Sequence, residues 1–229
     1  CLFERNTASG SGGGVRVSYA TIINSKIANN TSNSYGGGVY VSYANVINSQ
    51  ITNNTSSSYG GGVYLYYANV INSLIANNSS NSYGGGIYRG YGNITIANST
   101  IVRNSSVESG GGIYADGSMS LVNSVVWGNQ WNSAISNVAN ENNITSSYSA
   151  VEGGISGHHN IPLAAFNELD VFSPYFVNPS VLAGTADSTV NADWHLQANS
   201  PCINRGYNSS VYGSVDLDGN PRIQQDSVD

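Results

Sequence analysis

A glycine triplet recurs through the first half of the chain at nearly constant spacing, and each triplet is followed by Val or Ile. The triplets lie at steps of 24, 24, 24 and 26 residues, at Gly12–Gly14, Gly36–Gly38, Gly60–Gly62, Gly84–Gly86 and Gly110–Gly112. A period of this size is typical of solenoids, in which each repeat is one structural unit that buries its apolar face against its neighbours. The repeat therefore constrains the fold more than any other feature of the sequence.

Two series of asparagines keep the same step. The first series consists of Asn24, Asn48, Asn72, Asn98 and Asn123. The second follows closely behind branched or aromatic apolar residues and consists of Asn30, Asn54, Asn78, Asn104 and Asn129. Asn tolerates left-handed backbone angles, and its amide can bond to the amide of an identical residue stacked above it. We therefore expect both series to be stacked turn residues.

Each unit holds short runs rich in Val, Ile, Tyr and Thr, which favour strands, separated by Gly, Asn and Ser, which favour turns. Helical repeats need about 33 residues or more, and the leucine-rich pattern is missing. Three strands of about four residues and three turns fill one 24-residue unit. The sequence therefore predicts an all-β chain, a right-handed parallel β-helix of seven or eight coils stacked ~4.8 Å apart.

The positions within a unit separate into an inner set and an outer set. We expect Val15, Val17, Ile22, Ile27 and their equivalents to fill the interior. Two series of tyrosines are expected to stack on the outside. The first contains Tyr19, Tyr43, Tyr67 and Tyr91, and the second contains Tyr40, Tyr64, Tyr88 and Tyr114. A shorter series, Tyr35, Tyr59 and Tyr83, precedes the glycines.

The period blurs after residue 130, so we divide one domain into regular coils over 1–130 and an irregular part over 131–229. The segment Gly153–Asp193 holds three of the five prolines and is interpreted as long excursions from the last coils. Asp193–Leu196 and Pro201–Asn204 are expected to form a final coil. Because the open end of a β-helix is an exposed sheet edge, we expect the irregular part to cover that end.

Composition limits the possible partners. Only 9% of the residues are charged, the formal net charge is −6 and Lys26 is the single lysine, so a phosphate-binding basic patch for nucleic acid is not expected. No run approaches the ~18 apolar residues of a membrane-spanning helix. Cys1 and Cys202 lie at opposite ends and are interpreted as independent small residues. The chain opens within the repeat and shows no signal peptide, so we interpret it as a fragment of a longer protein.

The motifs resemble those of known bacterial families. The Gly-Gly-Gly-Val/Ile and Phe/Ile-x-x-Asn pair resembles the repeat of chlamydial polymorphic outer membrane proteins. Four C-terminal motifs, in order, are similar to those of the choice-of-anchor Q proteins, which are large secreted or surface β-helices; the motifs are Ser173–Pro179, Asp193–Gln197, Ser200–Gly206 and Asp216–Arg222. The resemblance covers nearly the whole chain. It implies a location outside the bacterial cell or on its surface, an anchor beyond Asp229, and no established single activity.

Enzymes of the β-helix class, such as pectate lyases and polygalacturonases, need clustered carboxylates or an Arg or Lys base. No Asp or Glu lies between Arg5 and Val107, so a catalytic site would have to lie in residues 108–229, and we assign no catalytic residue. The acidic candidates there are either isolated turn residues or neighbours on successive coils: Glu108, Asp116, Glu141 and Glu152.

Histidine and aspartate motifs are the remaining candidates for metal binding. His158–His159 lies in a Gly- and Asn-containing loop, and His195 follows Trp194 in an expected strand, where packing is the simpler interpretation. The pair Asp216 and Asp218, followed by Gly219, has the oxygen ligands of a Ca²⁺ turn but lacks the Glu of an EF-hand. Ca²⁺ is therefore the one possible cofactor, and a plain Asp-Gly turn is the alternative.

The tyrosine series are the best candidates for ligand binding, because stacked Tyr on an uncharged face can lie against sugar rings. Ring-on-ring stacking that shields the backbone is the alternative. A second candidate is a possible apolar stripe at Ile23, Ile47 and Ile71. We hypothesise an extracellular adhesin-type binding module or rigid stalk whose partners are cell-surface glycans or host proteins. The alternatives are a polysaccharide-active lyase or hydrolase fragment, and a spacer or self-assembling filament unit.

Overall fold

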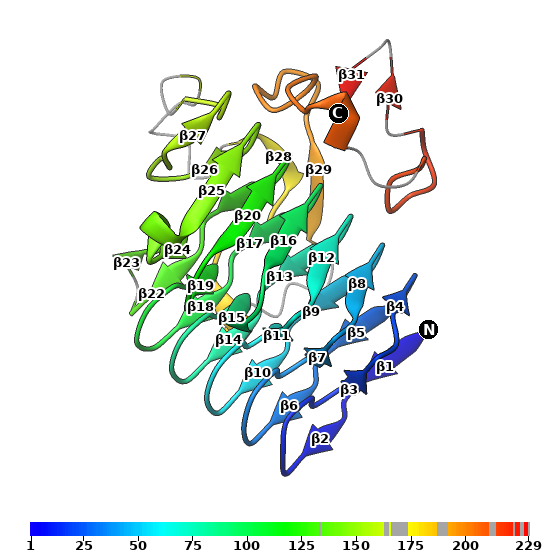
Figure 1. Cartoon of the computed structure of the whole chain (residues 1–229), viewed down its shortest axis with the longest axis vertical. Helices are drawn as coiled ribbons and strands as arrows, with labels where there is room; N and C mark the ends of the chain where they lie inside the picture. The colour runs from blue at the N-terminus through cyan, green and yellow to red at the C-terminus, as the bar shows by residue number, and fades with distance from the viewer. Residues whose placement is uncertain are drawn as a thin grey trace.

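The computed structural model shows a parallel β-helix in which each coil takes about 24 residues (Figure 1). It describes residues 1–132, 134–162, 165, 174–186, 192–210, 214–221, 223–224 and 227–228. Ser173 and Arg222, at the margins of two of the C-terminal motifs, lie outside the described residues. The described elements are strands and three short 3₁₀ helices, η1 (Glu141–Asn143), η3 (Gly184–Ala186) and η4 (Asn208–Ser210).

Four parallel sheets form the sides of the β-helix. Sheet A contains β1 (Leu2–Glu4), β5 (Lys26–Ala28), β9 (Gln50–Thr52), β13 (Leu74–Ala76), β17 (Thr100–Val102), β21 (Val125–Trp127) and β26 (Ala150–Val151). Sheet B contains β2 (Thr7–Ala8), β6 (Thr31–Ser32), β10 (Thr55–Ser56), β14 (Ser79–Ser80), β18 (Ser105–Ser106), β22 (Gln130–Trp131) and the antiparallel β23 (Ala134–Ile135).

The other two sheets have the same arrangement. Sheet C contains β3 (Val15–Ser18), β7 (Val39–Ser42), β11 (Val63–Tyr66), β15 (Ile87–Tyr91), β19 (Ile113–Ala115) and β24 (Val138–Ala139). Sheet D contains β4 (Ile22–Ile23), β8 (Asn45–Ile47), β12 (Asn69–Ile71), β16 (Ile94–Ala97), β20 (Met119–Val122), β25 (Ile144–Ser147) and β27 (Gly157–His158).

The expectation of three strands per coil is wrong in number, because each regular coil has four. The additional strand is the two-residue segment of sheet B, such as Thr31–Ser32. In sequence, two polar residues next to Asn are typical of a turn. In the fold they form a short strand that is hydrogen-bonded to the equivalent residues one coil away, with Thr31 opposite Thr55 and Ser32 opposite Ser56. The sheets hold six or seven strands, slightly fewer than the seven or eight coils expected.

The interior is a set of columns of identical or similar apolar residues. Val39 lies in register with Val63, Val46 with Val70, and Ile51 with Ile75, and all six are fully buried. Val15 and Val17, in the first coil, are only partly buried and pack against this core. Each fully buried Val or Ile contributes roughly 1.5–3 kcal/mol. Burial is therefore repeated at the same positions in each regular coil.

The glycine triplets lie where two turns of backbone approach most closely. A Cβ on Gly61 would lie less than 3.0 Å from the carbonyl oxygens of Ser79 and Gly85. The preceding Gly60 has a φ of 68°, in the left-handed region. Glycine is needed at these two positions for different reasons, one steric and one conformational.

The second asparagine series forms a buried ladder of hydrogen bonds. The side-chain oxygen of Asn78 accepts from the backbone N–H of Asn54 at 2.9 Å and from its amide at 3.0 Å. The amide of Asn78 also donates to the carbonyl of Ile51 at 2.9 Å. In this series the left-handed residue is the preceding one, with φ of 57° at Asn53 and 56° at Asn77. The side-chain amide of the ladder residue therefore hydrogen-bonds to the backbone of the turn, and the residue before it takes the left-handed conformation.

The first asparagine series occupies the corner between sheets D and A. Its members have φ between 49° and 52°. The amide of Asn48 donates to Asn24 at 2.6 Å, and that of Asn72 donates to Asn48 at 2.9 Å. One coil after Asn123, Tyr148 takes the same corner with a φ of 51°. The corner is therefore left-handed throughout. Its amides bond to one another in two short runs, and those of Asn72, Asn98 and Asn123 also donate to carbonyls of the C-terminal segment.

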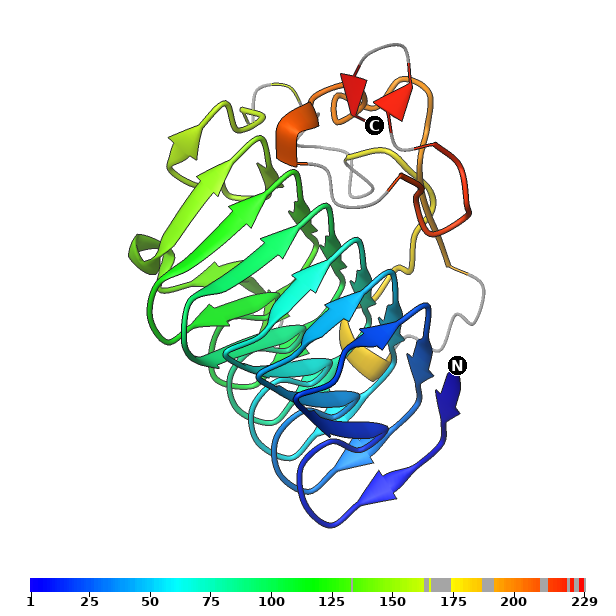
Figure 2. The same ribbon diagram turned by 45° about the vertical axis from the view of Figure 1, so that its right-hand side comes forward.

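The C-terminal segment folds back along the side of the stack. Strand β28 (Phe176–Asn178) pairs antiparallel with β29 (Asp193–Leu196), and β30 (Ile223–Gln224) pairs with β31 (Ser227–Val228). Phe176 and Cys202 pack on the outward side chains of sheet A at Ala76, Val102 and Trp127. Figure 2 shows the yellow and orange part of this segment beside the coils, with the red strands β30 and β31 farther from them.

One expectation for this segment is therefore wrong. Asp193–Leu196 is paired with β28, and neither it nor Pro201–Asn204 forms a final coil. The described part of the segment around Phe176 and Cys202 covers a side of the β-helix. The physical reason lies in the outward positions of sheet A, which change from Lys26 and Gln50 to Leu74 and Val125 along the stack. Those apolar side chains need a cover that the first coils do not need.

Candidate functional site

A groove of about 640 Å³ runs between sheet A and the C-terminal segment. Its floor is one outward column of sheet A, in which the residues lie in register on five successive strands: Gln50, Leu74, Thr100, Val125 and Ala150. At a coil spacing of ~4.8 Å, five strands give a trough roughly 20 Å long. The groove therefore has the shape of a site for an extended ligand.

The walls of the groove are polar on one side and mixed on the other. The corner asparagines Asn72, Asn98 and Asn123 form the first wall together with Tyr148. Trp194, His195 and Arg205 of the C-terminal segment belong to the second. Hydrogen bonds join the walls, since Asn72 donates to the carbonyl of Val215 at 3.1 Å, and Asn123 accepts from the N–H of Tyr207 at 2.8 Å.

Tyr148 is held rigidly at one end of the groove. Its ring stacks on Tyr207 at 5.0 Å and on His159 at 4.9 Å between centroids. Trp194 contacts Phe176 edge-on at 5.3 Å. Aromatic rings with a fixed orientation beside amide and hydroxyl groups are typical of small-molecule and sugar sites.

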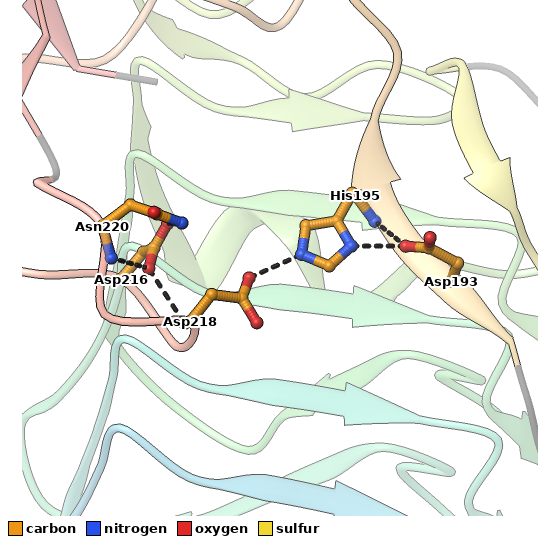
Figure 3. Close-up of polar contacts among 5 residues, drawn as sticks. All are labelled: Asp193, His195, Asp216, Asp218 and Asn220. Atoms are coloured by element: carbon orange, nitrogen blue, oxygen red, sulfur yellow. Dashed lines mark hydrogen bonds and ion pairs between the residues drawn. The ribbon is translucent and has the colours of Figure 1, made fainter.

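Three side chains form a polar cluster at the groove, which we call the His195 cluster: Asp193, His195 and Asp218 (Figure 3). The Nδ1 atom of His195 contacts Oδ1 of Asp193, and its Nε2 lies 2.5 Å from Oδ2 of Asp218. Asp193 also accepts from the backbone N–H of His195 at 3.0 Å. Since Asp193 and His195 belong to β29 and Asp218 to a distant loop, the cluster fastens that loop to the strand.

The charges of the cluster stabilise one another. The hydrogen bond to Asp218 is the main cause that raises the pKa of His195, and the bond to Asp193 adds to it. The backbone hydrogen bond from His195 is the main cause that lowers the pKa of Asp193. These directions favour an imidazolium between two carboxylates. They are opposite to what a carboxylic general acid needs, which is a raised pKa.

Asp216 and Asp218 point to different partners. Oδ1 of Asp216 accepts from the backbone N–H groups of Asp218 at 2.9 Å and Asn220 at 2.8 Å, which closes the loop on itself. Asp218 is directed to His195 instead (Figure 3). Within the described parts of the chain, no group of three or more His, Cys, Asp or Glu side chains is placed to hold a metal ion.

The other acidic candidates are dispersed. Asp116 accepts from the hydroxyl of Tyr88 at 3.2 Å, and Glu108 is a hydrogen-bond partner of Tyr83. Glu152 accepts from the amide of Asn137 at 3.0 Å and from the N–H of Gly128 at 2.7 Å, so it ends the buried asparagine ladder. Glu141 is exposed in η1. None of these four carboxylates lines the groove.

The two tyrosine series lie at different places on the surface. Tyr19, Tyr43 and Tyr67 stack at the corner between sheets C and D, with centroids 5.1 and 5.0 Å apart. Tyr40, Tyr64, Tyr88 and Tyr114 stack along the outer face of sheet C at 5.1, 5.2 and 5.4 Å. The shorter series interlocks with the second, for example Tyr59 on Tyr88 at 4.7 Å. Burial raises the pKa of Tyr64 to about 12.

This stacking decides what the tyrosines can offer to a ligand. The interplanar angle is 2° between Tyr19 and Tyr43 and 9° between Tyr43 and Tyr67, so Tyr43 has both faces covered. At such a ring only the edge and the hydroxyl group remain for a ligand. A sugar needs a free ring face to stack, so these columns are poor sugar platforms along their length.

The isoleucine stripe flanks the asparagine corner on the outer side of sheet D. Ile23 is 54% exposed, whereas Ile47 and Ile71 are half-buried, and Ala97 follows in the same column and is buried. Asn45 and Asn69 form a third amide ladder beside it, joined at 2.9 Å, which sequence reasoning missed. The stripe therefore shows a large exposed apolar side chain mainly in the first coil.

Sequence reasoning also missed the groove, because it left Asp193, His195 and Asp218 as separate strand and turn residues. The available signal was the change to apolar outward residues in sheet A from Leu74 onward, which marks the covered side. The pairing of Asp218 with His195 had no such signal, since it depends on the course of a long irregular segment.

No protein-family model and no curated protein match this chain. Among solved structures, the crystal structure of pectate lyase Pel9A matches with a TM-score of 0.46 and 18% sequence identity. The match covers 94% of this chain and 68% of that one. A sequence identity and a TM-score this low support no conclusion about activity. Separately, no helix within the described residues is long and apolar enough to cross a membrane.

Proposed function

We propose that the protein is an extracellular binding module of a bacterial cell surface that holds a polysaccharide chain in the groove beside sheet A. The observation that supports this proposal is the shape of the groove, a trough along five coils that is lined by amides, hydroxyls and Trp194. An extended polymer with many hydroxyl groups fits such a trough. Its hydroxyls would meet Asn98, Ser99 and Thr100, and one sugar ring would lie against the indole of Trp194.

The stack itself supports the role of a rigid display element. Identical columns of Val and Ile and the buried amide ladder join each coil to the next. The floor of the groove belongs to this rod and keeps its shape without a ligand, which lowers the entropy lost on binding. The surface location is carried by the resemblance of the repeat and of the C-terminal motifs to bacterial surface β-helices.

A second candidate function is a polysaccharide-cleaving enzyme, which one observation favours. Asp193 and Asp218 both line the groove, on opposite sides of His195. Against it, the pKa of Asp193 is lowered by its hydrogen bonds, so this carboxyl stays ionised and is a poor proton donor. Release of reducing ends from a polysaccharide, abolished by Asp218→Asn, would establish this alternative.

The binding proposal is tested by blocking the floor of the groove. Thr100→Trp places a large side chain in the trough, and we expect it to weaken binding at least ten-fold in calorimetry against a panel of soluble neutral and acidic polysaccharides. Leu2→Trp is the matched control, since Leu2 begins the same outward column, is 62% exposed and lies outside the groove. Absence of binding to the whole panel by the unaltered chain, or equal affinity of both variants, would contradict the proposal and favour a spacer.

A further inference from the structure

The coil that contains β15 is longer than its predecessors. The step from Gly84 to Gly110 is 26 residues, against 24 for each of the preceding steps. The pairing of β11 with β15 shifts register here, since Arg89 lies opposite Leu65 but Tyr91 lies opposite Tyr66. Gly90 is therefore an inserted, bulged residue. Bulges often redirect a side chain next to a functional site.

Arg89 occupies a column that is otherwise apolar. It pairs in register with Leu65 on one side and Ala115 on the other, and both are fully buried. Arg89 itself is only 7% exposed. A guanidinium in place of an aliphatic side chain costs several kcal/mol of desolvation unless its charge is compensated.

The structure compensates this charge only in part. Nη1 of Arg89 donates to the carbonyls of Gly90, at 3.3 Å, and Asp116, and Nη2 donates to the carbonyl of Gly92 at 2.5 Å. Nε is buried and has no partner. Among the described residues no carboxylate forms an ion pair with Arg89. Oδ2 of the neighbouring Asp116 accepts from the hydroxyl of Tyr88. Three of the five N–H donors are thus used, and Nε and one N–H of Nη2 remain.

The surroundings of the guanidinium leave no room for other side chains. A Cβ on Gly117 would lie less than 3.0 Å from Nη1 of Arg89, and a Cβ on Gly92 would lie equally close to the ring of Tyr67. A Cβ on Gly90 would meet the hydroxyl of Tyr64 at similar distance. Glycines at these three points let the backbone carbonyls close around the cation.

A hollow of about 530 Å³ lies beside this arginine, lined by Tyr67, Arg89, Tyr91, Gly92 and Asn93. The corner tyrosine column changes here: Tyr67 is parallel to Tyr43, at 9°, but Tyr91 is turned 64° from Tyr67. Tyr91 therefore does not continue the stack, and it is 56% exposed. The column ends at a hollow that contains a buried cation with free donors.

We propose that Arg89 and this hollow form a binding site for a carboxylate group. The N–H of Nη2 that remains free is the donor that a carboxylate in the hollow would use, and hydrogen bonds between two charged groups are among the stronger ones. Nε is closed off from solvent, so the carboxylate supplies the missing counter-charge to the guanidinium and not a partner for Nε. The amide of Asn93 and the hydroxyls of Tyr67 and Tyr91 line the same hollow and can bond the rest of the ligand.

The carboxylate can come from an acidic sugar or from a small free acid, and the same chemistry recognises both. The site lies at the corner between sheets C and D, with no residue in common with the groove beside sheet A. The proposal therefore goes beyond the proposed function, and Thr100→Trp, which blocks the groove, should leave this site unchanged.

The site is tested by calorimetry at constant ionic strength with sodium acetate, sodium glucuronate and glucose as probes, and by thermal unfolding in acetate against chloride. We expect both carboxylates, but not glucose, to bind and to raise the Tm by roughly 2–4 °C at saturation. At least ten-fold tighter binding of glucuronate than of acetate identifies an acidic sugar, and equal affinity identifies a free acid.

Variants decide whether Arg89 is responsible. Arg89→Leu restores the residue found one coil earlier, Leu65, and should fold but lose the response to carboxylates. Arg16→Leu removes another arginine of sheet C, one that lies over the ring of Tyr40, and should keep the response. Equal behaviour in acetate and chloride, binding of glucose as tight as that of glucuronate, or an undiminished response in Arg89→Leu would overturn the proposal.

Discussion

The regular coils and the folded-back C-terminal segment are held by different kinds of contact. In the coils each residue is bonded to its equivalent one coil away, as with Asn54 and Asn78 or Val39 and Val63. The C-terminal segment is attached by scattered single bonds, such as that of Ser180 to Asn77 at 2.8 Å, and by one small apolar cluster. The repeated contacts make the coils rigid, but they make every coil alike. The groove forms only where the irregular C-terminal segment lies over sheet A.

The largest expected loss of stability comes from a substitution in the regular coils, where two turns of backbone lie closest together. Gly61→Ala forces a methyl group against the carbonyls of Ser79 and Gly85, which cannot move without disturbing two coils. We expect the free energy of unfolding, measured with urea, to fall by about 3 kcal/mol or more. Gly10→Ala is the control, since nothing lies within 4 Å of its Cβ, and it should change stability by less than about 0.5 kcal/mol.

Removal of a buried ladder amide is next in size. Asn78→Ala leaves the N–H of Asn54 and the carbonyl of Ile51 without partners in a dry interior. We expect a loss of about 2–4 kcal/mol in the same unfolding measurement. Asn69→Ala removes a half-buried ladder amide on the outer side of sheet D and should cost about 1 kcal/mol or less, because water can replace it. Equal losses would show that burial does not set the strength of the ladder.

The tyrosine columns should contribute less than the buried amides. Tyr64→Ala removes a ring that stacks on both Tyr40 and Tyr88, so we expect a loss of about 1–3 kcal/mol. Tyr19→Ala removes an end ring with one stacked neighbour, Tyr43, and should cost roughly half as much. A larger loss for Tyr19→Ala, measured by thermal unfolding, would contradict stacking as the source of the effect.

The smallest effect on global stability is expected in the C-terminal segment. In Asp218→Asn the main cause of the raised pKa of His195 is removed, so this pKa should fall toward its ordinary value of 6.5 in an NMR titration. Because both groups are exposed, the free energy of unfolding should change by less than about 0.5 kcal/mol. A pKa of His195 that does not move in this variant would show that the contact is not maintained in solution.

The pH dependence of the His195 cluster follows from the two shifts. A raised pKa of His195 means that its contribution is complete below pH 6.5 and is lost as the pH rises through the folded-state value. A lowered pKa of Asp193 means that its contribution is complete above pH 3.8 and is lost as the pH falls through its folded-state value. Between these limits the loop should be fastened most firmly, which hydrogen exchange of residues 214–221 would reveal.

The features that recur in every coil could mostly be predicted from the sequence, whereas the course of the irregular segment could not. The 24-residue period, the interior columns such as Val39 and Ile51, and the left-handed first asparagine series followed from local rules of burial and turn chemistry. The fourth strand was missed because Thr31 and Ser32 have no apolar alternation, and only pairing with the next coil makes them a strand.

The candidate site could not be predicted from the sequence for a different reason. The groove depends on where a segment of more than 30 residues crosses back over the coils, and no local preference specifies such a course. His195 was interpreted as a packing residue, yet it lies exposed between Asp193 and Asp218, which are 2 and 23 positions away in sequence. Arg89 is buried because it lies in register with Leu65 and Ala115 in an inward column, where a charged residue is unexpected.

The residue-by-residue register between successive coils has a consequence for how such a chain can change its size. The segments 44–49 and 68–73 are the same six letters, and their neighbours above and below are also alike. Deleting or duplicating 24 residues between them would bring most side chains onto a copy of their former neighbour, and the rod would shorten or lengthen by ~4.8 Å. Recombination between such segments of the gene could therefore change the length of the rod in whole coils, with few new contacts in the interior.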